Sequence, residues 1–258
     1  MSQLAPLQLL LIALVFVWSG FVRSGLGFGG AVLSLPFLLL IDNRPLLYLP
    51  IIAVQLLIFS SSIWLQNVWR QRRATASGTV LSSGVDWIYL RRALAIMIVP
   101  KLVGVFGLIM LPADVMTRII FCIVGVYAIS YIVNRPFESR SPALDIGLLA
   151  AGAYVSGTSL IGAPLIMIVF AKNVAKQQLR DTLFALWFIL VLIKLIALVY
   201  ARVDLHLAEQ LWLLPCAGLG HFIGLRFHRY IVSADQRLFF RALGSVLLLI
   251  SLIGLWQG

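Results

Sequence analysis

Long apolar segments follow one another along nearly the whole chain, and they constrain its fold more than any other feature. The apolar runs cover residues 5–22 with 31–41, 46–69, 87–110, 115–133, 143–155 with 160–171, 181–200, 207–225 and 238–256. A run of about 20 apolar residues crosses a bilayer as one helix. The chain is 62% hydrophobic and 11% charged, whereas soluble domains carry about 25% charged residues. The sequence therefore predicts an all-α polytopic membrane protein.

A glycine-rich break follows the first apolar run. Four glycines lie close together between Arg23 and Pro36, namely Gly25, Gly27, Gly29 and Gly30. Glycine is a poor helix former, so the cluster indicates a break in the helix. Backbone without helical hydrogen bonds cannot face lipid and must face protein or a water-filled cavity. In transporters such broken helices mark binding sites.

A second break repeats the first about half a chain later. Ser24-Gly25 and Gly30-Ala31 recur as Ser156-Gly157 and Gly162-Ala163, each pair 132 residues farther along the chain. We interpret this as an internal repeat, with a first membrane repeat at 1–133, a cytoplasmic linker at 134–142 and a second membrane repeat at 143–258. Each repeat would hold one broken segment and three crossing helices.

Basic residues in the loops distinguish two arrangements of the second broken segment. If residues 143–171 cross the membrane once, the two sides carry 8 and 9 basic loop residues, which gives no orientation. If they enter and return as a hairpin, 14 basic residues share one side and 3 remain on the other. Cytoplasmic loops are enriched in lysine and arginine, so we favour the hairpin. The same loops explain the net charge of +11, and we expect no nucleic-acid partner.

By symmetry, the first repeat should also begin with a re-entrant hairpin. An odd number of crossings in each half gives the two repeats inverted topology, with both chain termini outside the cytoplasm. Residues 5–22 are long enough to cross alone, which leaves open a crossing broken helix in the first repeat.

Both breaks resemble the signatures of a known family. Residues 27–36, GFGGAVLSLP, resemble the glycine-rich signature of the TauE/SafE family, and residues 156–165, SGTSLIGAPL, resemble its second signature. The second signature differs where Ser159, Leu160 and Ile161 replace more glycine-rich positions. The resemblance implies an anion permease of the bacterial inner membrane, associated with export of sulfite and organosulfonates. We expect no cofactor, no metal and no catalytic step, and a homodimer is left open.

A re-entrant hairpin suits an anion because its second half-helix begins at membrane depth. The first N–H groups of that half-helix are unpaired and carry partial positive charge, so such ends bind anions. We expect the ends near 29–32 and 161–164 to converge, with glycines admitting a small oxyanion and hydroxyls donating to it. Tight helix packing is the alternative role. The candidate binding residues in the breaks are Ser24, Gly25, Gly27, Gly29, Gly30, Ser156, Gly157, Thr158, Ser159, Gly162 and Pro164.

Three basic residues lie outside the loops, namely Arg23, Lys101 and Lys194. A lysine or arginine at the bilayer centre costs about 2.5–3.5 kcal/mol on insertion scales, which indicates a role for each. We expect Arg23 either to attract or hold the anion or to pair with a counter-charge or a carbonyl. Lys101 and Lys194 should either line the pathway or snorkel toward the outer interface.

A few further polar residues are candidates. Gln55 and Thr182 fall at roughly matching places in the two repeats, where each could donate to an oxyanion or bond a neighbouring helix. His221 lies inside an apolar run and could relay a proton near neutral pH, or serve only in packing. All nine acids fall near segment ends, so Asp181 at an interface is the other proton-relay candidate.

These observations favour a secondary transporter that exports a small oxyanion by alternating access, with a midplane site between two hairpins. An anion channel built from the same hairpins is the first rival. A membrane-embedded enzyme is a weaker rival, because the sequence lacks the buried acid–base pairs expected for catalysis.

Overall fold

The computed structural model describes residues 1, 4–26, 30–76, 84–133, 141–233 and 236–257 of the chain. These residues form ten helices and no strand, as the sequence predicts. The helices are α1 (Pro6–Leu26), α2 (Gly30–Ile41), α3 (Pro45–Ala76), α4 (Trp87–Met110), α5 (Ala113–Val133), α6 (Pro142–Ser159), α7 (Ala163–Asn173), α8 (Lys176–Tyr200), α9 (Leu207–Ser233) and α10 (Gln236–Gln257).

Side-chain caps fix the starts of α4 and α6, two helices that lie near the candidate site described below. The Asp86 carboxylate accepts a hydrogen bond from the Tyr89 N–H at 2.9 Å and caps α4. The Ser141 hydroxyl accepts from the Leu144 N–H at 3.2 Å and caps α6. Asp and Ser are preferred at this position because their side chains satisfy N–H groups that lack helical partners.

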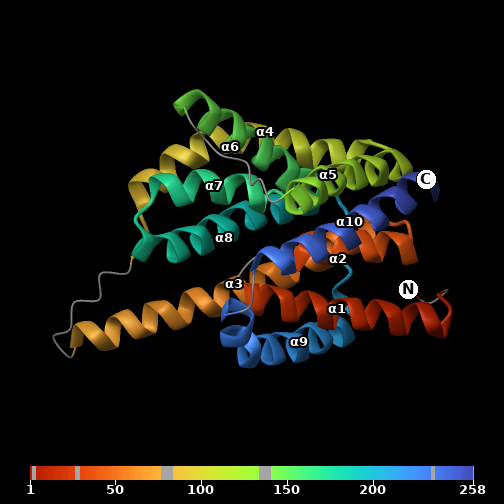
Figure 1. Ribbon diagram of the computed structural model, residues 1–258, viewed down its shortest axis with the longest axis horizontal. Coiled ribbons are helices and arrows are strands. Elements are labelled where there is room, and N and C mark those ends of the chain that lie inside the picture. The colour runs from red at the N-terminus through yellow and green to blue at the C-terminus, as the bar shows by residue number, and fades with distance from the viewer. Residues whose placement is uncertain (2–3, 27–29, 77–83, 134–140, 234–235, 258) are drawn as a thin grey trace.

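Two pairs of helices form antiparallel hairpins. Gln8, near the start of α1, donates to the carbonyl of Ile41 at the end of α2, at 3.2 Å. Lys172, near the end of α7, forms a 3.1 Å ion pair with Asp145 near the start of α6. The chain therefore reverses between α1 and α2 and again between α6 and α7. The reversal between α6 and α7 is the one that the loop charges favoured, and the reversal between α1 and α2 is the one expected by symmetry. Figure 1 shows both chain termini at the same end of the bundle.

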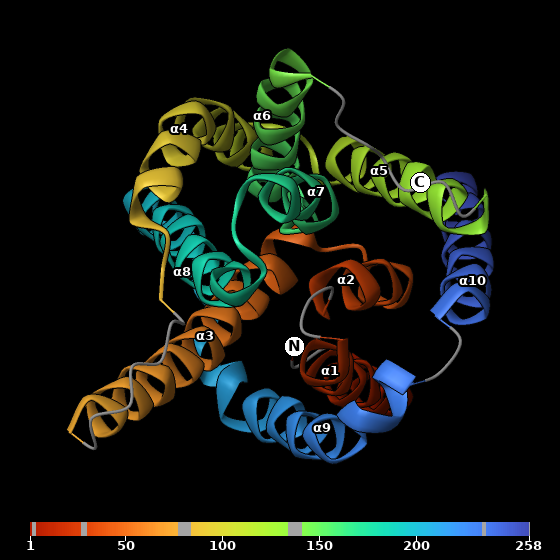
Figure 2. The same cartoon turned by 60° about the vertical axis from the view of Figure 1, so that its left-hand side comes forward.

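Two hydrophobic cores divide the helices differently from the two halves of the sequence. One core joins α4, α6, α7 and α8. The other is built mainly from α1, α2, α3, α5, α9 and α10. Helix α1 packs along α9, α5 along α10 and α4 along α6 (Figures 1 and 2). Each hairpin is therefore held by helices from both sequence halves.

Glycines allow the closest of these helix contacts. A Cβ atom on Gly20 of α1 would lie 2.0 Å from the Ala217 carbonyl oxygen, and one on Gly220 of α9 would lie 1.8 Å from that of Val17. Small residues at membrane helix interfaces let the backbones approach in this way. Helices α1 and α9 therefore pack with their backbones in direct contact.

Several helices have the length and composition of membrane spans. Within the described residues, four are long and apolar enough to cross a bilayer, namely Pro6–Ser24, Trp87–Met110, Ala113–Val133 and Lys176–Tyr200. Large apolar side chains such as Val99, Val103 and Phe106 of α4 are exposed. A helix that exposes an apolar face in this way suits lipid rather than water. The fold is that of an all-α polytopic membrane protein.

Candidate functional site

The first hairpin places Arg23 at its tip. Arg23 lies in the last turn of α1, and α2 begins at Gly30. A Cβ atom on Gly30 would lie 3.0 Å from the Ser19 carbonyl oxygen and 3.3 Å from Arg23 Nε. Glycine at position 30 therefore lets the first turn of α2 approach the arginine closely. Gly25 belongs to α1, whereas Gly27 and Gly29 lie outside the described residues.

The second hairpin turns at residues 160–162. Leu160 takes a left-handed conformation (φ 61°), and its N–H bonds the Ser156 carbonyl, which ends α6. Gly162 precedes α7, and a Cβ atom there would lie 1.9 Å from the Gly152 carbonyl oxygen. Pro164 occupies the first turn of α7, where its missing N–H costs no helical bond. The turn is therefore compact enough to lie between packed helices.

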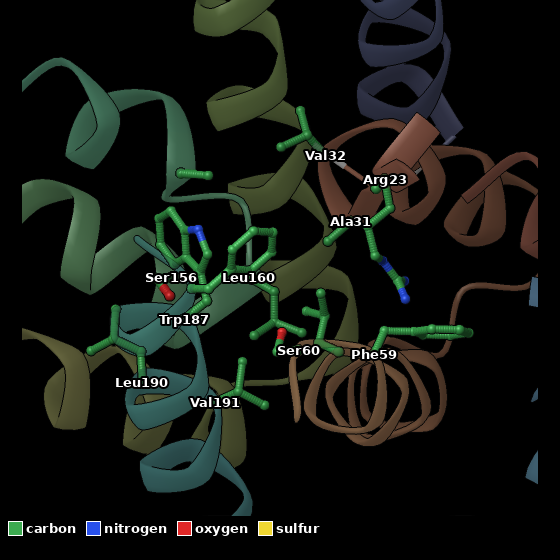
Figure 3. Close-up of a pocket in the computed structure, with 14 residues that line it drawn as sticks. Arg23, Ala31, Val32, Phe59, Ser60, Ser156, Leu160, Trp187, Leu190 and Val191 are labelled. Carbon is green, nitrogen blue, oxygen red and sulfur yellow. The ribbon is translucent and has the colours of Figure 1, made fainter. Parts of the chain in front are cut away.

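A cavity of about 70 Å³ lies between the two hairpin tips (Figure 3). Gly30, Ala31 and Val32 of the first turn of α2 border it. Ser156, Leu160 and Ala163 of the α6–α7 tip also border it. The remaining lining residues are Arg23 of α1, Leu56, Phe59 and Ser60 of α3, and Phe184, Trp187, Leu190 and Val191 of α8. The volume has room for several water-sized molecules, and residues from the starts of both α2 and α7 border it.

Arg23 supplies the cation of this cavity. Its Nη2 lies 3.5 Å from Ser19 Oγ, and its guanidinium carbon lies 4.9 Å from the centre of the Phe59 ring. Figure 3 shows the Arg23 side chain directed from the first hairpin toward α3. Nε and Nη1 are buried, and neither has a hydrogen-bond partner among the described residues. Buried N–H groups are nearly always paired, so the partners of these two nitrogen atoms must come from outside the described residues.

Ser24 and His221 form a polar contact beside Arg23. Ser24 Oγ donates to the Gly20 carbonyl at 3.0 Å and is hydrogen-bonded to His221 Nδ1 of α9. A hydroxyl has one hydrogen to donate, so the Ser24 hydroxyl donates to one of these two acceptors at a time. The His221 ring also lies 5.1 Å from the Phe59 ring, centre to centre. Phe59 therefore lies against both Arg23 and His221.

Lys101 and Lys194 contact the backbone of the second hairpin. Both lysines are fully buried. Lys101 Nζ donates to the carbonyl and hydroxyl oxygens of Ser156 at 2.9 and 2.8 Å. Lys194 Nζ donates to the carbonyls of Gly157 and Thr158 at 2.7 and 3.2 Å. Both amino groups thus bond the end of α6 instead of reaching outward to an interface.

The other hydroxyls of this hairpin point back onto α6. Thr158 Oγ1 and Ser159 Oγ both donate to the Val155 carbonyl, at 3.0 and 2.9 Å. Among the described residues of the hairpin, Ser156 is the hydroxyl residue that lines the cavity.

The remaining polar candidates bond neighbouring helices. Gln55 Nε2 donates to Gln210 Oε1 of α9 at 3.2 Å. Thr182 Oγ1 accepts from the Asp86 N–H at 3.0 Å and joins α8 to the start of α4. Neither belongs to the described lining of the cavity, nor does Asp181. No cluster of three or more metal-binding side chains occurs in the described part of the chain.

The comparison with protein-family models matches residues 11–254 of the 258-residue chain to a family described as sulfite exporter TauE/SafE. The chain belongs to this family. No curated protein and no solved structure matches it. The matched residues include the first hairpin from residue 11 onward, the whole second hairpin and all of the described lining of the cavity. The resemblance noted in the two glycine-rich breaks therefore extends to nearly the whole chain, and this is a membrane protein of a transporter family.

Sequence reasoning missed two walls of the cavity in this TauE/SafE protein. Leu56, Phe59 and Ser60 form one stripe on α3, and Phe184, Trp187 and Val191 form another on α8. Both stripes follow the three-to-four-residue spacing that places side chains on one helix face. Because the opposite faces of these helices are also largely apolar, the spacing could not show which face was turned to a cavity.

Proposed function

We propose that this TauE/SafE protein is a secondary transporter that exports a small oxyanion such as sulfite or an organosulfonate. The observation that supports this most strongly is the shared cavity. Two hairpin tips from different halves of the sequence border it, and a buried arginine lies at its edge, with two nitrogen atoms that have no hydrogen-bond partner among the described residues.

The chemistry of the cavity suits an anion. The first turns of α2 and α7 border it, and the start of a helix attracts negative charge through its unpaired N–H groups. Arg23 adds a guanidinium, whose planar array of N–H donors matches an oxyanion. Among the described residues that line the cavity none is acidic. A bound oxyanion would exchange its hydration for these donors.

The two hydrophobic cores suggest how access could alternate. The cavity lies where the body of α4, α6, α7 and α8 meets the body that contains α1, α2 and α9. We propose that these two bodies rock about the bound anion and open it to each side in turn. These two bodies differ from the two sequence halves, because each hairpin packs on helices from both halves.

His221 is the better of the two proton-relay candidates. It is hydrogen-bonded to Ser24 next to Arg23, whereas Asp181 is absent from the described lining of the cavity. Helices α1 and α3 pack against α9. Among their described titratable groups, Arg23 is the one that contacts the same Phe59 ring as His221. We propose that protonation of His221 strengthens anion binding by adding positive charge near the site.

The loop charges support an orientation in a bacterial inner membrane. The ends of α3, α5, α7 and α9 meet the starts of the next helices in the loops that carry 14 basic residues. We propose that these loops face the cytoplasm, in line with the positive-inside rule, and that both termini face away from it.

Flux measurements in liposomes test the proposed function. Purified protein should move sulfite with saturable kinetics, and sulfite on the opposite side should accelerate that flux by exchange. A conductance far above carrier turnover would instead identify a channel. Covalent conversion of the anion would identify an enzyme. If the protein neither binds nor moves sulfite, sulfoacetate, sulfolactate, taurine or sulfate, the proposal of a sulfur oxyanion is wrong.

A further inference from the structure

Two fully buried lysines converge on the C-terminal end of α6. Lys101 comes from α4 and Lys194 from α8, and together they make four hydrogen bonds to three consecutive residues of α6. Neither lysine forms an ion pair with an acid among the described residues. Burying an amino group without an acidic partner costs free energy. The hydrogen bonds that these lysines donate to the hairpin therefore indicate that each has a specific role.

The end of α6 creates the need for these donors. The last carbonyls of a helix have no intrahelical partner and carry partial negative charge. The Ser156 carbonyl receives the N–H of Leu160, and Lys101 donates to it as well. Lys194 donates to the next two carbonyls along the chain. Without these donors, the partial negative charge at the end of α6 would lie next to the cavity and would repel an anion.

Close packing of α4 against α6 sets the reach of Lys101. A Cβ atom on Gly104 would lie 2.3 Å from the Tyr154 carbonyl oxygen, and one on Gly157 would lie 2.4 Å from that of Lys101. The two backbones therefore touch at this point, one helical turn from Lys101. This register is what brings Lys101 Nζ within 2.8 Å of Ser156 Oγ.

We infer that Lys101 and Lys194 are positioning residues, which satisfy the end of α6 so that Ser156 can donate to the transported anion. Ser156 Oγ accepts from Lys101, and the described residues include no acceptor for its own hydrogen. Ser156 also lines the cavity, whereas the hydroxyls of Thr158 and Ser159 are turned onto Val155. The lysines thus shape the specificity of the site without lining it. This inference rests on the proposed anion site.

A double-mutant cycle tests the inference with sulfite as the probe. Lys101→Met keeps the length of the side chain and removes its donors, and Ser156→Ala removes the hydroxyl. Each single change should weaken sulfite binding about 10- to 150-fold, the effect of losing one hydrogen bond to a charged group. The double variant should bind only slightly more weakly than either single variant, because both changes remove the same donor. Lys172→Met, at the exposed far end of the same hairpin, is the matched control and should bind like the wild type.

The outcomes separate this inference from the proposed function. If wild-type protein binds no sulfur oxyanion, the proposed function fails. If the wild type binds sulfite and a folded Lys101→Met variant binds it equally well, the inference alone fails. Fully additive losses in the double variant would also overturn it. If Lys101→Met does not assemble, Lys101→Arg restores N–H donors. Recovery of both assembly and affinity then supports the inference, and recovery of assembly alone contradicts it.

Discussion

Replacing Arg23 by methionine tests the charged part of the proposed site. Two of its nitrogen atoms, Nε and Nη1, are buried and have no partner in the described residues. A hydrogen bond to a charged group contributes about 1.5–3 kcal/mol, and about 1.4 kcal/mol is tenfold in affinity. If the anion accepts from one of these groups, Arg23→Met should weaken its binding about 10- to 150-fold.

The stability of the ligand-free protein should respond differently. An unpaired buried donor costs about 1–3 kcal/mol, and methionine removes two such donors. The change also loses the contact between the guanidinium and Phe59, which contributes about 0.5–2 kcal/mol. These effects oppose each other, so the melting temperature without anion should stay near the wild-type value or rise.

Thermal unfolding in detergent with and without sulfite measures both quantities. Wild-type protein should be stabilised by sulfite, because a ligand that binds only the folded state raises its stability, and Arg23→Met should lose most of that increase. Arg23→Lys should fall between them, since lysine keeps a positive charge but not the planar donors. The exposed Arg91 provides the control Arg91→Met. An Arg23→Met protein that is folded and still stabilised by sulfite like the wild type would refute the role of Arg23.

Three further predictions follow from the same geometry. Gly30→Ala places a methyl group about 3.3 Å from Arg23 Nε and should weaken sulfite binding, whereas unchanged affinity would show that this contact relaxes freely. The affinity of the wild type for sulfoacetate, whose own charge is constant between about pH 8 and 5, should rise as the pH falls through that range. His221→Gln should flatten that profile, and a profile that stays steep would remove His221 as the relay. In a background without the native cysteines, Ala175→Cys and Arg140→Cys should label from the same side of the membrane, and labelling from opposite sides would disprove the second hairpin.

Much of the architecture could be predicted from the sequence because membrane constraints are strong. Apolar runs set the helices, and the positions of the basic loop residues favoured a hairpin at residues 143–171. The structure has that hairpin, closed by the left-handed Leu160 and by Gly162. The glycine-rich breaks also indicated where the two tips would converge.

The details of the site could not be predicted because they depend on the direction in which each side chain points. Thr158, Ser159 and Ser156 are equivalent hydroxyl residues in sequence, yet the first two bond Val155 and the third borders the cavity. Lys101 and Lys194 come from helices that are not equivalent in the repeat, and they meet only because both pack on α6. The packing of each hairpin on helices from both sequence halves is likewise a property of the whole fold.

The most direct test of the central claim is to locate a bound anion. Selenite, the heavier analogue of sulfite, scatters X-rays anomalously at selenium and can be placed in a crystal structure of the protein without ambiguity. The account predicts selenite between the two hairpin tips, within hydrogen-bond distance of Arg23 Nε or Nη1 and near the Ser156 hydroxyl. Selenite bound elsewhere, with this cavity empty at a saturating concentration, would contradict the account.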